Sequence, residues 1–547
     1  MADKPQKVVI LGGGFAGVYT GMYLAKWARR ARIPVEITIV NRDNYIVFQP
    51  LLPDVISGAI EILHVVSSIR RLVPQARLIT REIESIDLEN KRVILAPGFQ
   101  PALMTLEYDH LVLALGTVLD YSKVPGMNEH GISFKYLGDA LKLRHLLVEA
   151  MEEADISTDP EERQRLLTFV VAGGGFSGVE CMAELNDFVK AAAKAFQTIR
   201  PDECKFVLLQ SADRILPEMA PALAKFAHQI LERRGIDIRL NTRLSAVTAC
   251  GASYTNSLTK ETAFLPSRTT VVTVPAGPHP LVKSLPCKLE RGRILVDDHL
   301  SIAEWPNVWA VGDCAAIPQG NGQFSPPTAQ HATRQAKKCA ENILARMKGK
   351  PTTPFHFPGL GKLGSLGKGQ AVAEIMGVKI SGVLAWLLWR GIYLSKLPGF
   401  DRKVRVFFDW ILDLFLPLDI TQVRIFYPDD VTREHFEPGE VVFQQGDVGD
   451  KLYFIAKGEA EVIKDGEVCV GLKQGDMFGE YALVSKSARS AMIRVKTPLD
   501  VVSMSRHTFE ELISNLPGMK ETMQSVISRY VQRLPPASAP CETASDA

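Results

Sequence analysis

The stretch KVVILGGGFAGVYTGMYLA, residues 7–25, joins an apolar run, three spaced glycines and a helix-forming segment. Gly12, Gly14 and Gly17 have the G-x-G-x-x-G spacing of a dinucleotide-binding strand–helix unit. In such a unit the first glycine permits a tight turn, the second lets the backbone approach a pyrophosphate, and the third lets helix and strand pack closely. The helix N-terminus then favours the negative charge of the diphosphate. Taken alone, the same letters also suit an ordinary glycine-rich turn.

A second copy, FVVAGGGFSGVECMAELN at 169–186, makes that simpler interpretation hard to keep. It repeats the strand, the helix and the glycine spacing, with Gly173, Gly175 and Gly178 in place. We therefore predict an α/β protein with two Rossmann-like domains. Two nucleotide sites in one chain suggest a flavin and a nicotinamide held face to face.

The composition of the chain excludes several classes of function. The chain has 547 residues, 46% of them hydrophobic and 23% charged, which is ordinary for a globular protein of several domains. A net charge of +2 gives no reason to expect nucleic-acid binding. The eight cysteines are scattered without a CxxC pair, so neither a redox dithiol nor a metal site is expected. We see no secretory signal and no apolar run of about 18 residues that would span a bilayer.

Two further segments belong to the flavin half. YDHLVLALGT ends in Gly116 and Thr117, and NVWAVGDCAAIP contains Gly312 and Asp313. An aspartate there can accept a ribityl hydroxyl hydrogen bond or orient donors toward a phosphate, although Asp also favours helix N-caps. Because the second segment returns far downstream of the second fingerprint, we predict that the flavin domain is split around the nicotinamide domain.

By this point the residues resemble the two-dinucleotide-binding-domain flavoproteins and, within them, the type II NADH:quinone oxidoreductases. The resemblance covers about residues 6–425. Its more specific marks are NRDNYIVFQPLLPDVISG at 41–58, GGGFSGVE at 173–180, ADRILP at 212–217 and SPPTAQHATRQA at 325–336. It implies bound FAD, NADH or NADPH as reductant, a membrane quinone as acceptor, and no proton pumping. Sulfide:quinone oxidoreductases share the scaffold but need cysteines beside the flavin, and Cys181 and Cys339 keep that alternative open.

The resemblance also assigns catalytic roles. Glu180 would lie near the nicotinamide and the flavin, where it positions one of them or modulates proton movement; its simpler role is a dipole-compensating acid in the first helical turn. Glu184, one turn later, is expected to be structural. Ala329 and Gln330 would approach the polar edge of the flavin ring and the quinone pocket. His331 is either a proton relay or, more simply, a packing and hydrogen-bonding residue.

Other residues are expected to bind the cofactors. The family often has an acid for the FAD ribose where Asn41 stands, and an asparagine can still accept one hydrogen bond. The segment 49–52 would form a wall of the quinone pocket, or plain core. The full set of expected cofactor-binding residues is Gly12, Gly14, Phe15, Ala16, Gly17, Asn41, Arg42, Gly116, Thr117, Gly173, Gly175, Phe176, Ser177, Gly178, Gln210, Arg214, Gly277, Gly312, Asp313, Ala329 and Gln330.

In the stretch FVLLQSADRI, residues 206–215, the expected strand ends at Gln210. An NADH site usually has a carboxylate at this position. A carboxylate would accept both ribose hydroxyls and repel the 2′-phosphate of NADPH. A neutral amide removes that repulsion, and Arg214 is a nearby candidate for the phosphate. We therefore predict that NADPH is accepted.

Residues 355–425 change composition sharply. Trp386, Trp389, Trp410 and several phenylalanines alternate with Lys and Arg, which suits helices lying in a membrane interface. The alternative is a helix pair packed on its own domain or on a dimer mate. The resembled family docks on a membrane through this region. The resulting expectation is a homodimeric, peripheral enzyme on the cytoplasmic face of the inner membrane.

After residue 426, short strands with glycine turns predict an antiparallel barrel or jelly roll. The stretch FGEYALVSKSARSA at 478–491 resembles the phosphate cassette of cyclic nucleotide-binding domains, which implies cAMP or cGMP as an effector. There Glu480 would hold the ribose and Arg489 the cyclic phosphate. The usual proline before the arginine is Ala488, so a barrel without a ligand is the alternative. The expected ligand-binding residues are Gly479, Glu480, Ala482, Leu483, Arg489 and Ser490.

These segments divide the chain as follows: FAD-binding domain at 1–164 and 286–350, NAD(P)H-binding domain at 165–285, membrane-docking segment at 351–425, cyclic nucleotide-binding domain at 426–535 and disordered tail at 536–547. A final helix at 519–534 could act as a lid over the cyclic nucleotide. The reaction expected is hydride transfer from NAD(P)H to FAD, followed by electron transfer to quinone. A second possibility keeps the scaffold with another acceptor, and a third is a non-catalytic sensor that responds to cyclic nucleotides.

Overall fold

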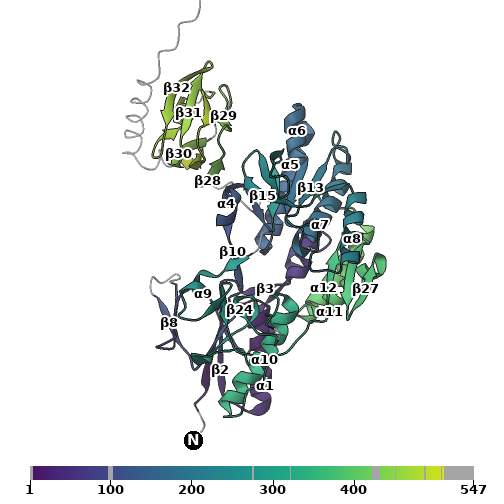
Figure 1. Cartoon of the computed structure of the whole chain (residues 1–547), viewed down its shortest axis with the longest axis vertical. Coiled ribbons are helices and arrows are strands. Elements are labelled where there is room, and N and C mark those ends of the chain that lie inside the picture. The colour runs from purple at the N-terminus through teal and green to yellow at the C-terminus, as the bar shows by residue number, and fades with distance from the viewer. Residues whose placement is uncertain are drawn as a thin grey trace, which may run out of the picture.

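The structure, a computed structural model, has two α/β domains, a segment packed beside them and a separate domain of strands (Figure 1). It describes residues 4–96, 103–273, 276–320, 322–421, 431–449, 451–485, 488–506 and 508–509. The expected lid helix and tail lie outside the described residues.

The first domain is built on a six-stranded sheet. Its strands, in spatial order, are β22 (Ser301–Ile302), β23 (Trp305–Ala310), β9 (His110–Leu113), β1 (Gln6–Leu11), β2 (Val35–Asn41) and β5 (Arg77–Thr80). β1 pairs in parallel with both β2 and β9, so the strand order reverses beside it. In open α/β sheets, ligands bind in the crevice at such a switch point. Helices α1 (Phe15–Ala31) and α10 (Ala329–Met347) pack against each other in this domain.

The second domain repeats this plan with a five-stranded parallel sheet. Its strands, in spatial order, are β11 (Ile132–Ser133), β18 (Thr269–Val272), β12 (Thr168–Ala172), β13 (Lys205–Leu209) and β14 (Ile236–Arg239). β12 lies between β13 and β18, which is the arrangement of β1 between β2 and β9. The main helices of this domain are α5 (Leu137–Ile156), α6 (Pro160–Leu166), α7 (Phe176–Ala192) and α8 (Pro221–Arg233).

The chain crosses between the domains twice, which confirms the predicted split. An antiparallel ribbon of β10 (Thr117–Leu119) and β19 (Ala276–Pro278) carries it out of the first domain and back. Smaller sheets decorate both domains. They are β3 (Tyr45–Val47) with β4 (Val66–Ser68), β6 (Ile83–Asp87) with β7 (Arg92–Leu95) and β8 (Met104–Glu107), β15 (Thr242–Val247) with β16 (Gly251–Asn256) and β17 (Thr262–Pro266), and β20 (Leu289–Glu290) with β21 (Arg293–Leu295) and β24 (Ala315–Ala316).

The composition of the segment after α10 alone suggests helices throughout, but the structure is different. The segment begins with an antiparallel sheet of β25 (Gly361–Ser365), β26 (Ala371–Ile375) and β27 (Val378–Ser381), followed by α11 (Val383–Lys396) and α12 (Phe400–Phe415). This sheet packs against α7 and α8. Together with α2 (Leu52–Ile56), these elements share one hydrophobic core with the second domain.

The C-terminal domain has two four-stranded antiparallel sheets, as the barrel prediction requires. One sheet contains β28 (Val431–Phe436), β35 (Leu499–Ser505), β30 (Lys451–Lys457) and β33 (Met477–Phe478), and the other β29 (Val441–Phe443), β34 (Met492–Val495), β31 (Ala460–Lys464) and β32 (Glu467–Leu472). A short helix, α13 (Glu480–Ser485), follows β33. The domain lies beside α4 (Met127–His130) and β15 (Figure 1).

Candidate active site and nucleotide sites

The first glycine fingerprint has the geometry that its spacing predicts. A Cβ at Gly12 would lie 2.1 Å from the carbonyl oxygen of Ala114, and one at Gly17 would lie 1.9 Å from that of Gly12. A Cβ at Gly14, in contrast, would meet no described atom within 4 Å. Gly12 and Gly17 are therefore needed for packing within the protein, while Gly14 leaves space open at the start of α1.

The second fingerprint repeats these distances. A Cβ at Gly178 would lie 1.7 Å from the carbonyl oxygen of Gly173, whereas one at Gly175 would meet no described atom within 4 Å. Within the described residues, neither α1 nor α7 has a side-chain cap or an acidic residue in its first turn. Each helix thus presents backbone N–H groups to the open space, which fits the diphosphate of a dinucleotide.

The polar residues at the two strand ends form matching hydrogen bonds. Gly13 N donates to Asn41 Oδ1 at 2.8 Å, and Gly174 N donates to Gln210 Oε1 at 3.1 Å. Each side-chain amide then donates to a backbone carbonyl further on, Asn41 to Asp43 at 2.8 Å and Gln210 to the carbonyl of Arg214 at 2.9 Å. The two amides therefore hold equivalent glycine loops closed.

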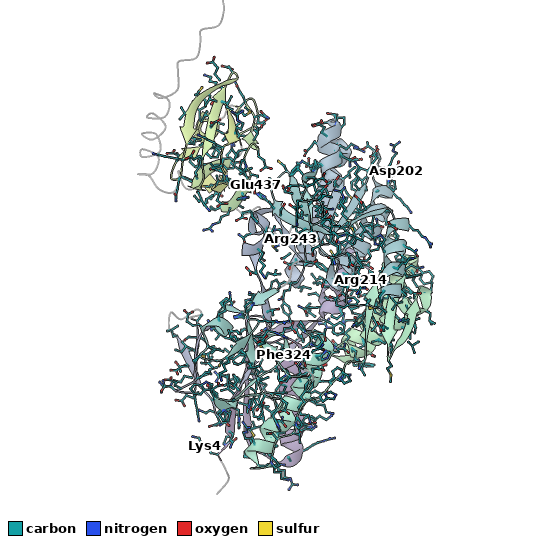
Figure 2. The ribbon with its side chains drawn as sticks, in the orientation of Figure 1. Lys4, Asp202, Arg214, Arg243, Phe324 and Glu437 are labelled. Carbon is teal, nitrogen blue, oxygen red and sulfur yellow. The ribbon has the colours of Figure 1, made fainter. Side chains whose placement is uncertain are left out.

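Gln210 is matched to its loop because it both accepts and donates. An ionised glutamate could still accept from Gly174 N, but it has no N–H for the carbonyl of Arg214. Arg214 itself is half-buried and donates to the carbonyl of Pro217 at 3.0 Å. Figure 2 labels it at the edge of the second domain nearest the first. The side chain is thus only partly accessible to a ligand.

A half-buried lysine and a half-buried aspartate lie on the flavin side. Lys135 Nζ donates to Thr117 O at 2.5 Å and to Thr117 Oγ1 at 2.9 Å. Burial lowers the pKa of Lys135, and the charge of nearby Asp313 opposes this change. Burial raises the pKa of Asp313, against the charges of Lys135 and Arg293. Gly312 N donates to Gln335 Oε1 at 2.9 Å, which ties the Gly-Asp turn to α10.

The remaining predicted cofactor residues lie around these turns. Ala16 is buried, and a Cβ at Gly312 would approach its methyl group within 2.9 Å. Gly277 pairs with Val118 in the connecting ribbon, so it belongs to the link between the domains. The others lie as follows: Phe15 at the start of α1, half-buried against Phe48; Arg42 exposed over the ring of Tyr136; Gly116 in open space with φ of 65°; Phe176 and exposed Ser177 at the start of α7.

Gln330 connects α10 to the C-terminal segment. Its Nε2 donates to Gly361 O at 3.1 Å, and its Oε1 accepts from Leu360 N at 3.2 Å. Ala329, the first residue of α10, is half-buried beside it. His331 is buried, bonds Thr328 Oγ1 through Nδ1 at 2.7 Å and packs edge-on against Phe357. These contacts suit the packing role for His331.

Glu180 is a buried acid, only 8% exposed. It is the fifth residue of α7, so the alternative of an exposed first-turn acid that compensates the dipole does not apply. Its Oε1 accepts from Ser365 N at 2.9 Å and from Trp389 Nε1 at 3.3 Å. Burial raises the pKa of Glu180 to about 8, although both hydrogen bonds lower it. The carboxyl is therefore largely protonated at neutral pH and can donate a proton.

The residues that were candidates for other roles are core residues. Leu51 and Leu52, at most 2% exposed, pack in the core and not on the cavity described below. Cys181 and Cys339 are fully buried, and burial raises the pKa of each thiol. Because only the thiolate is an effective nucleophile, these two cysteines do not support the sulfide-oxidising alternative.

The aromatic and other large apolar residues of the C-terminal segment differ in exposure. Trp389 and Trp410 are buried, and their indole N–H groups donate to acids of the core, so the prediction that they face a membrane is wrong for these two. A group of large apolar side chains is exposed on α11 and α12. Its members are Val383, Leu384, Leu387, Phe400, Val404, Phe407, Phe408, Leu412, Leu414 and Phe415. No helix in the described part of the chain is long and apolar enough to cross a bilayer.

In the C-terminal barrel, Arg489 is held from within. Its guanidinium donates to the carbonyls of Gly479 and Lys451, each at 2.8 Å, and lies 4.1 Å from the ring centroid of Phe443. Burial raises the pKa of Glu480, and the charge of Arg489 opposes this. The structure therefore brings Glu480, Gly479 and Arg489 together at the start of α13. Ala482 and Leu483 are buried in α13, and Ser490 is exposed.

The barrel contacts the second domain through a histidine pair. His130, at the end of α4, accepts from His435 N through Nε2 at 3.0 Å and packs edge-on against Phe436. His435 Nδ1 bonds Asp500 Oδ1 at 2.5 Å. Burial lowers the pKa of His435, but the carboxylates of Asp500 and Glu437 raise it above its ordinary value overall. Glu437 lies at the barrel edge nearest the second domain (Figure 2).

Comparison with known proteins agrees with this architecture. The sequence profile of the pyridine nucleotide-disulphide oxidoreductase family matches residues 6–336, that of the NDH2 C-terminal domain 360–416, and that of the cyclic nucleotide-binding domain 433–515.

Two known proteins are similar in sequence to most of the chain. A probable NADH dehydrogenase of Dictyostelium discoideum is 31% identical over 426 residues, covering 76% of this chain and 91% of its own length. The type II NADH:quinone oxidoreductase NdhA of Mycobacterium tuberculosis is 31% identical over 417 residues, with 74% and 86% covered. The solved structure of Plasmodium falciparum NDH2 with NADH has the same fold, with a TM-score of 0.71 at 20% identity, covering 76% of this chain and all of that one.

Proposed function

This chain belongs to the pyridine nucleotide-disulphide oxidoreductase family and, within it, to the type II NADH:quinone oxidoreductases, and we propose that it oxidises NADH or NADPH with a membrane quinone through bound FAD. When bound, the flavin supplies the two-electron chemistry between the nicotinamide and the quinone. The protein binds both dinucleotides, orients them and controls proton access.

The observation that carries the proposal is the duplicated open cradle. Gly14 and Gly175 each leave space at the N-terminus of a helix without a side-chain cap among the described residues. Asn41 and Gln210 hold the two loops in the same way. We assign the cradle at Gly14 to the FAD diphosphate, and that at Gly175 to the diphosphate of the nicotinamide cofactor. Buried Glu180, just beyond the second cradle, would donate a proton on the quinone side.

The test is flavin spectroscopy of the purified full-length protein. NADH added without oxygen should bleach the flavin absorbance, and a short-chain quinone should restore it. Protein without a flavin spectrum would overturn the proposal. A flavin that NADH reduces but that sulfide-linked or protein acceptors reoxidise faster than quinones do would favour another acceptor on the same scaffold.

For the nicotinamide, we propose that NADPH is accepted alongside NADH. Gln210 brings no negative charge to the strand end, and Arg214 is half-buried in the following loop. A 2′-phosphate, which carries about −1.5 to −2 charges near neutral pH as other phosphomonoesters do, would therefore meet no carboxylate from residue 210.

For the membrane, we propose peripheral attachment on the cytoplasmic face through α11 and α12. Exposed phenylalanines and leucines on these helices stand among Lys and Arg, which suits insertion into the interface of an anionic bilayer. Co-sedimentation with anionic vesicles should fall strongly when Phe407 and Phe408 are both replaced by Ser. Unchanged sedimentation would assign this face to another contact, such as a dimer mate.

For the barrel, we propose that it binds a cyclic nucleotide and thereby modulates the flavoenzyme. In support, Glu480 begins α13, and Arg489 donates to the carbonyl of Gly479 just before it. The contact between His130 and His435 gives the barrel a direct link to the nicotinamide domain. Titration calorimetry with cAMP and with cGMP tests the binding, and turnover with and without the ligand tests the modulation. Binding without any change in turnover would leave the barrel as a sensor unconnected to catalysis.

A further inference from the structure

A cavity of about 750 Å³ reaches the buried acids next to Glu180. It lies between α2, α5, α7, α11 and α12, and the carboxyl-bearing residues Asp54 and Glu184 line it together with Ser365. Ser365 is the residue whose N–H donates to Glu180. The cavity therefore extends to the peptide N–H that binds Glu180. It is also lined by two acids, Asp54 and Glu184, to which the proposed function assigns no role.

The three acids form a connected group. Glu180 and Glu184 are four residues apart on α7, so their side chains are neighbours on one helix face. Asp54, from α2, influences the charge of both. Its Oδ2 accepts from Trp410 Nε1 at 2.9 Å, while Glu180 accepts from Trp389. The two indole rings lie 6.3 Å apart, so this tryptophan pair holds both ends of the group.

The charged groups that face these acids do not neutralise them all. Arg390 lies 3.9 Å and 4.8 Å from the ring centroids of Trp386 and Trp410, and its positive charge acts on both Asp54 and Glu184. The other charged or titratable groups facing the acids or lining the cavity are Asp187 and Arg234 beside Glu184, Asp413 beside Asp54, Tyr393 beside Glu180, and Arg144, His145, Glu61, Lys368, Asp409 and Asp419 on the cavity walls.

The proposed reaction requires a proton from water. NADH gives up a hydride, which is two electrons and one proton, whereas a quinone that becomes a quinol gains two electrons and two protons. One O–H bond of the quinol is therefore made with a proton from solution in each turnover. Because Glu180 is only 8% exposed, it must recover its proton through the protein.

We propose that Asp54 and Glu184 carry protons from water in this cavity to Glu180, which gives them to the quinone. In each turnover one Glu180 O–H bond breaks as one quinol O–H bond forms, and the carboxylate left behind takes a proton from Glu184, which Asp54 and cavity water replenish. The inference rests on the proposed quinone reductase function. It assigns a role in that reaction to two acids outside both nucleotide cradles.

Burial affects the protonation of all three acids. Burial raises the pKa of Asp54 to about 6, so it exchanges protons with water near neutral pH. Burial also raises the pKa of Glu184 well above its ordinary value and that of Glu180 to about 8. Burial therefore favours the protonated form of all three acids, which is the form in which each can pass a proton on.

The experiment uses two electron acceptors on full-length, FAD-loaded protein. Ferricyanide takes electrons and no protons, whereas a short-chain ubiquinone takes both. In Glu184→Gln and Asp54→Asn we expect kcat with the quinone to fall about 100-fold, at the lower end of what general acid–base catalysis contributes. Flavin reduction by NADH and turnover with ferricyanide should stay close to the wild-type values. The solvent deuterium isotope effect on quinone turnover should rise, and Glu184→Asp should restore part of the rate.

Glu61→Gln is the matched control, because Glu61 is an exposed acid on the wall of the same cavity. It should leave both acceptors unaffected. Quinone turnover that is unchanged in both Glu184→Gln and Asp54→Asn would overturn the proposal, and so would a parallel loss with both acceptors. If the proposed function itself is wrong, the wild-type protein reduces ferricyanide but no quinone, which distinguishes the two failures.

Discussion

Replacing Glu180 by glutamine should stabilise the protein increasingly as the pH rises. The carboxyl has an ordinary pKa of 4.5 and a pKa of about 8 in the fold, where burial is the main cause. Between these values the unfolded chain releases a proton that the folded protein keeps, so wild-type stability falls as the pH increases. Each pH unit between the two pKa values costs about 1.36 kcal/mol, so the loss reaches about 4 kcal/mol at pH 8 and stays below about 1 kcal/mol at pH 5.

Glutamine has the same shape as glutamate and can accept the same hydrogen bonds from Ser365 and Trp389, but it does not ionise. The assay is thermal unfolding of the holoenzyme between pH 5 and pH 8, followed by flavin fluorescence. At about 2 °C per kcal/mol for a large domain, the variant should melt about 8 °C higher than wild type at pH 8. The two proteins should melt nearly together at pH 5. A difference in melting temperature that does not change with pH would refute the reasoning, because it would mean that Glu180 has the same pKa in the folded and the unfolded protein.

Three further predictions concern the nucleotide sites. Gln210→Glu should shift the ratio of kcat/KM values toward NADH by about 10- to 100-fold, which corresponds to about 1.4–2.7 kcal/mol of charge repulsion; an unchanged ratio would show that residue 210 does not face the 2′-position. Gly175→Val should raise KM for NADH at least about tenfold with little loss of stability. Gly178→Ala should instead unfold more easily, because its Cβ would meet a carbonyl oxygen at 1.7 Å. Melting temperatures and steady-state kinetics would contradict this prediction if both variants behaved alike. Arg489→Ala should abolish cyclic nucleotide binding in calorimetry and lower the melting temperature of the barrel, since it leaves two backbone carbonyls without a donor, at about 1–3 kcal/mol; undiminished binding would remove this arginine from the site.

Much of the fold follows from local pattern in the sequence. The glycine positions predict not only two dinucleotide domains but also which glycines pack internally and which leave space, because each requirement concerns atoms only a few residues away. The split of the first domain is predictable for a similar reason, since the Gly312 segment has the form of a buried strand that must pair within the flavin sheet. The barrel is predictable from alternating residues and glycine turns.

The C-terminal segment is less predictable from its sequence. Its tryptophans and arginines have the composition of a membrane-facing helix, yet Trp389 and Trp410 are buried against Glu180 and Asp54. The β25–β27 sheet is also missed, because its short strands follow a glycine-rich stretch without a strong alternating pattern. Composition indicates that aromatic residues are needed in this segment, but it does not indicate which surface they cover.

The sequence by itself determined the two nucleotide cradles, the amide at the end of each second strand and the additional C-terminal domain, because these depend on short-range spacing and residue type. Only the tertiary structure decided what surrounds Glu180. Its neighbours come from α2, β25, α11 and α12, and they meet only when the C-terminal segment folds back over α7. The protonation of a carboxyl depends on how much water and charge surround it, so the chemistry of Glu180, Glu184 and Asp54 emerges from packing between distant parts of the chain.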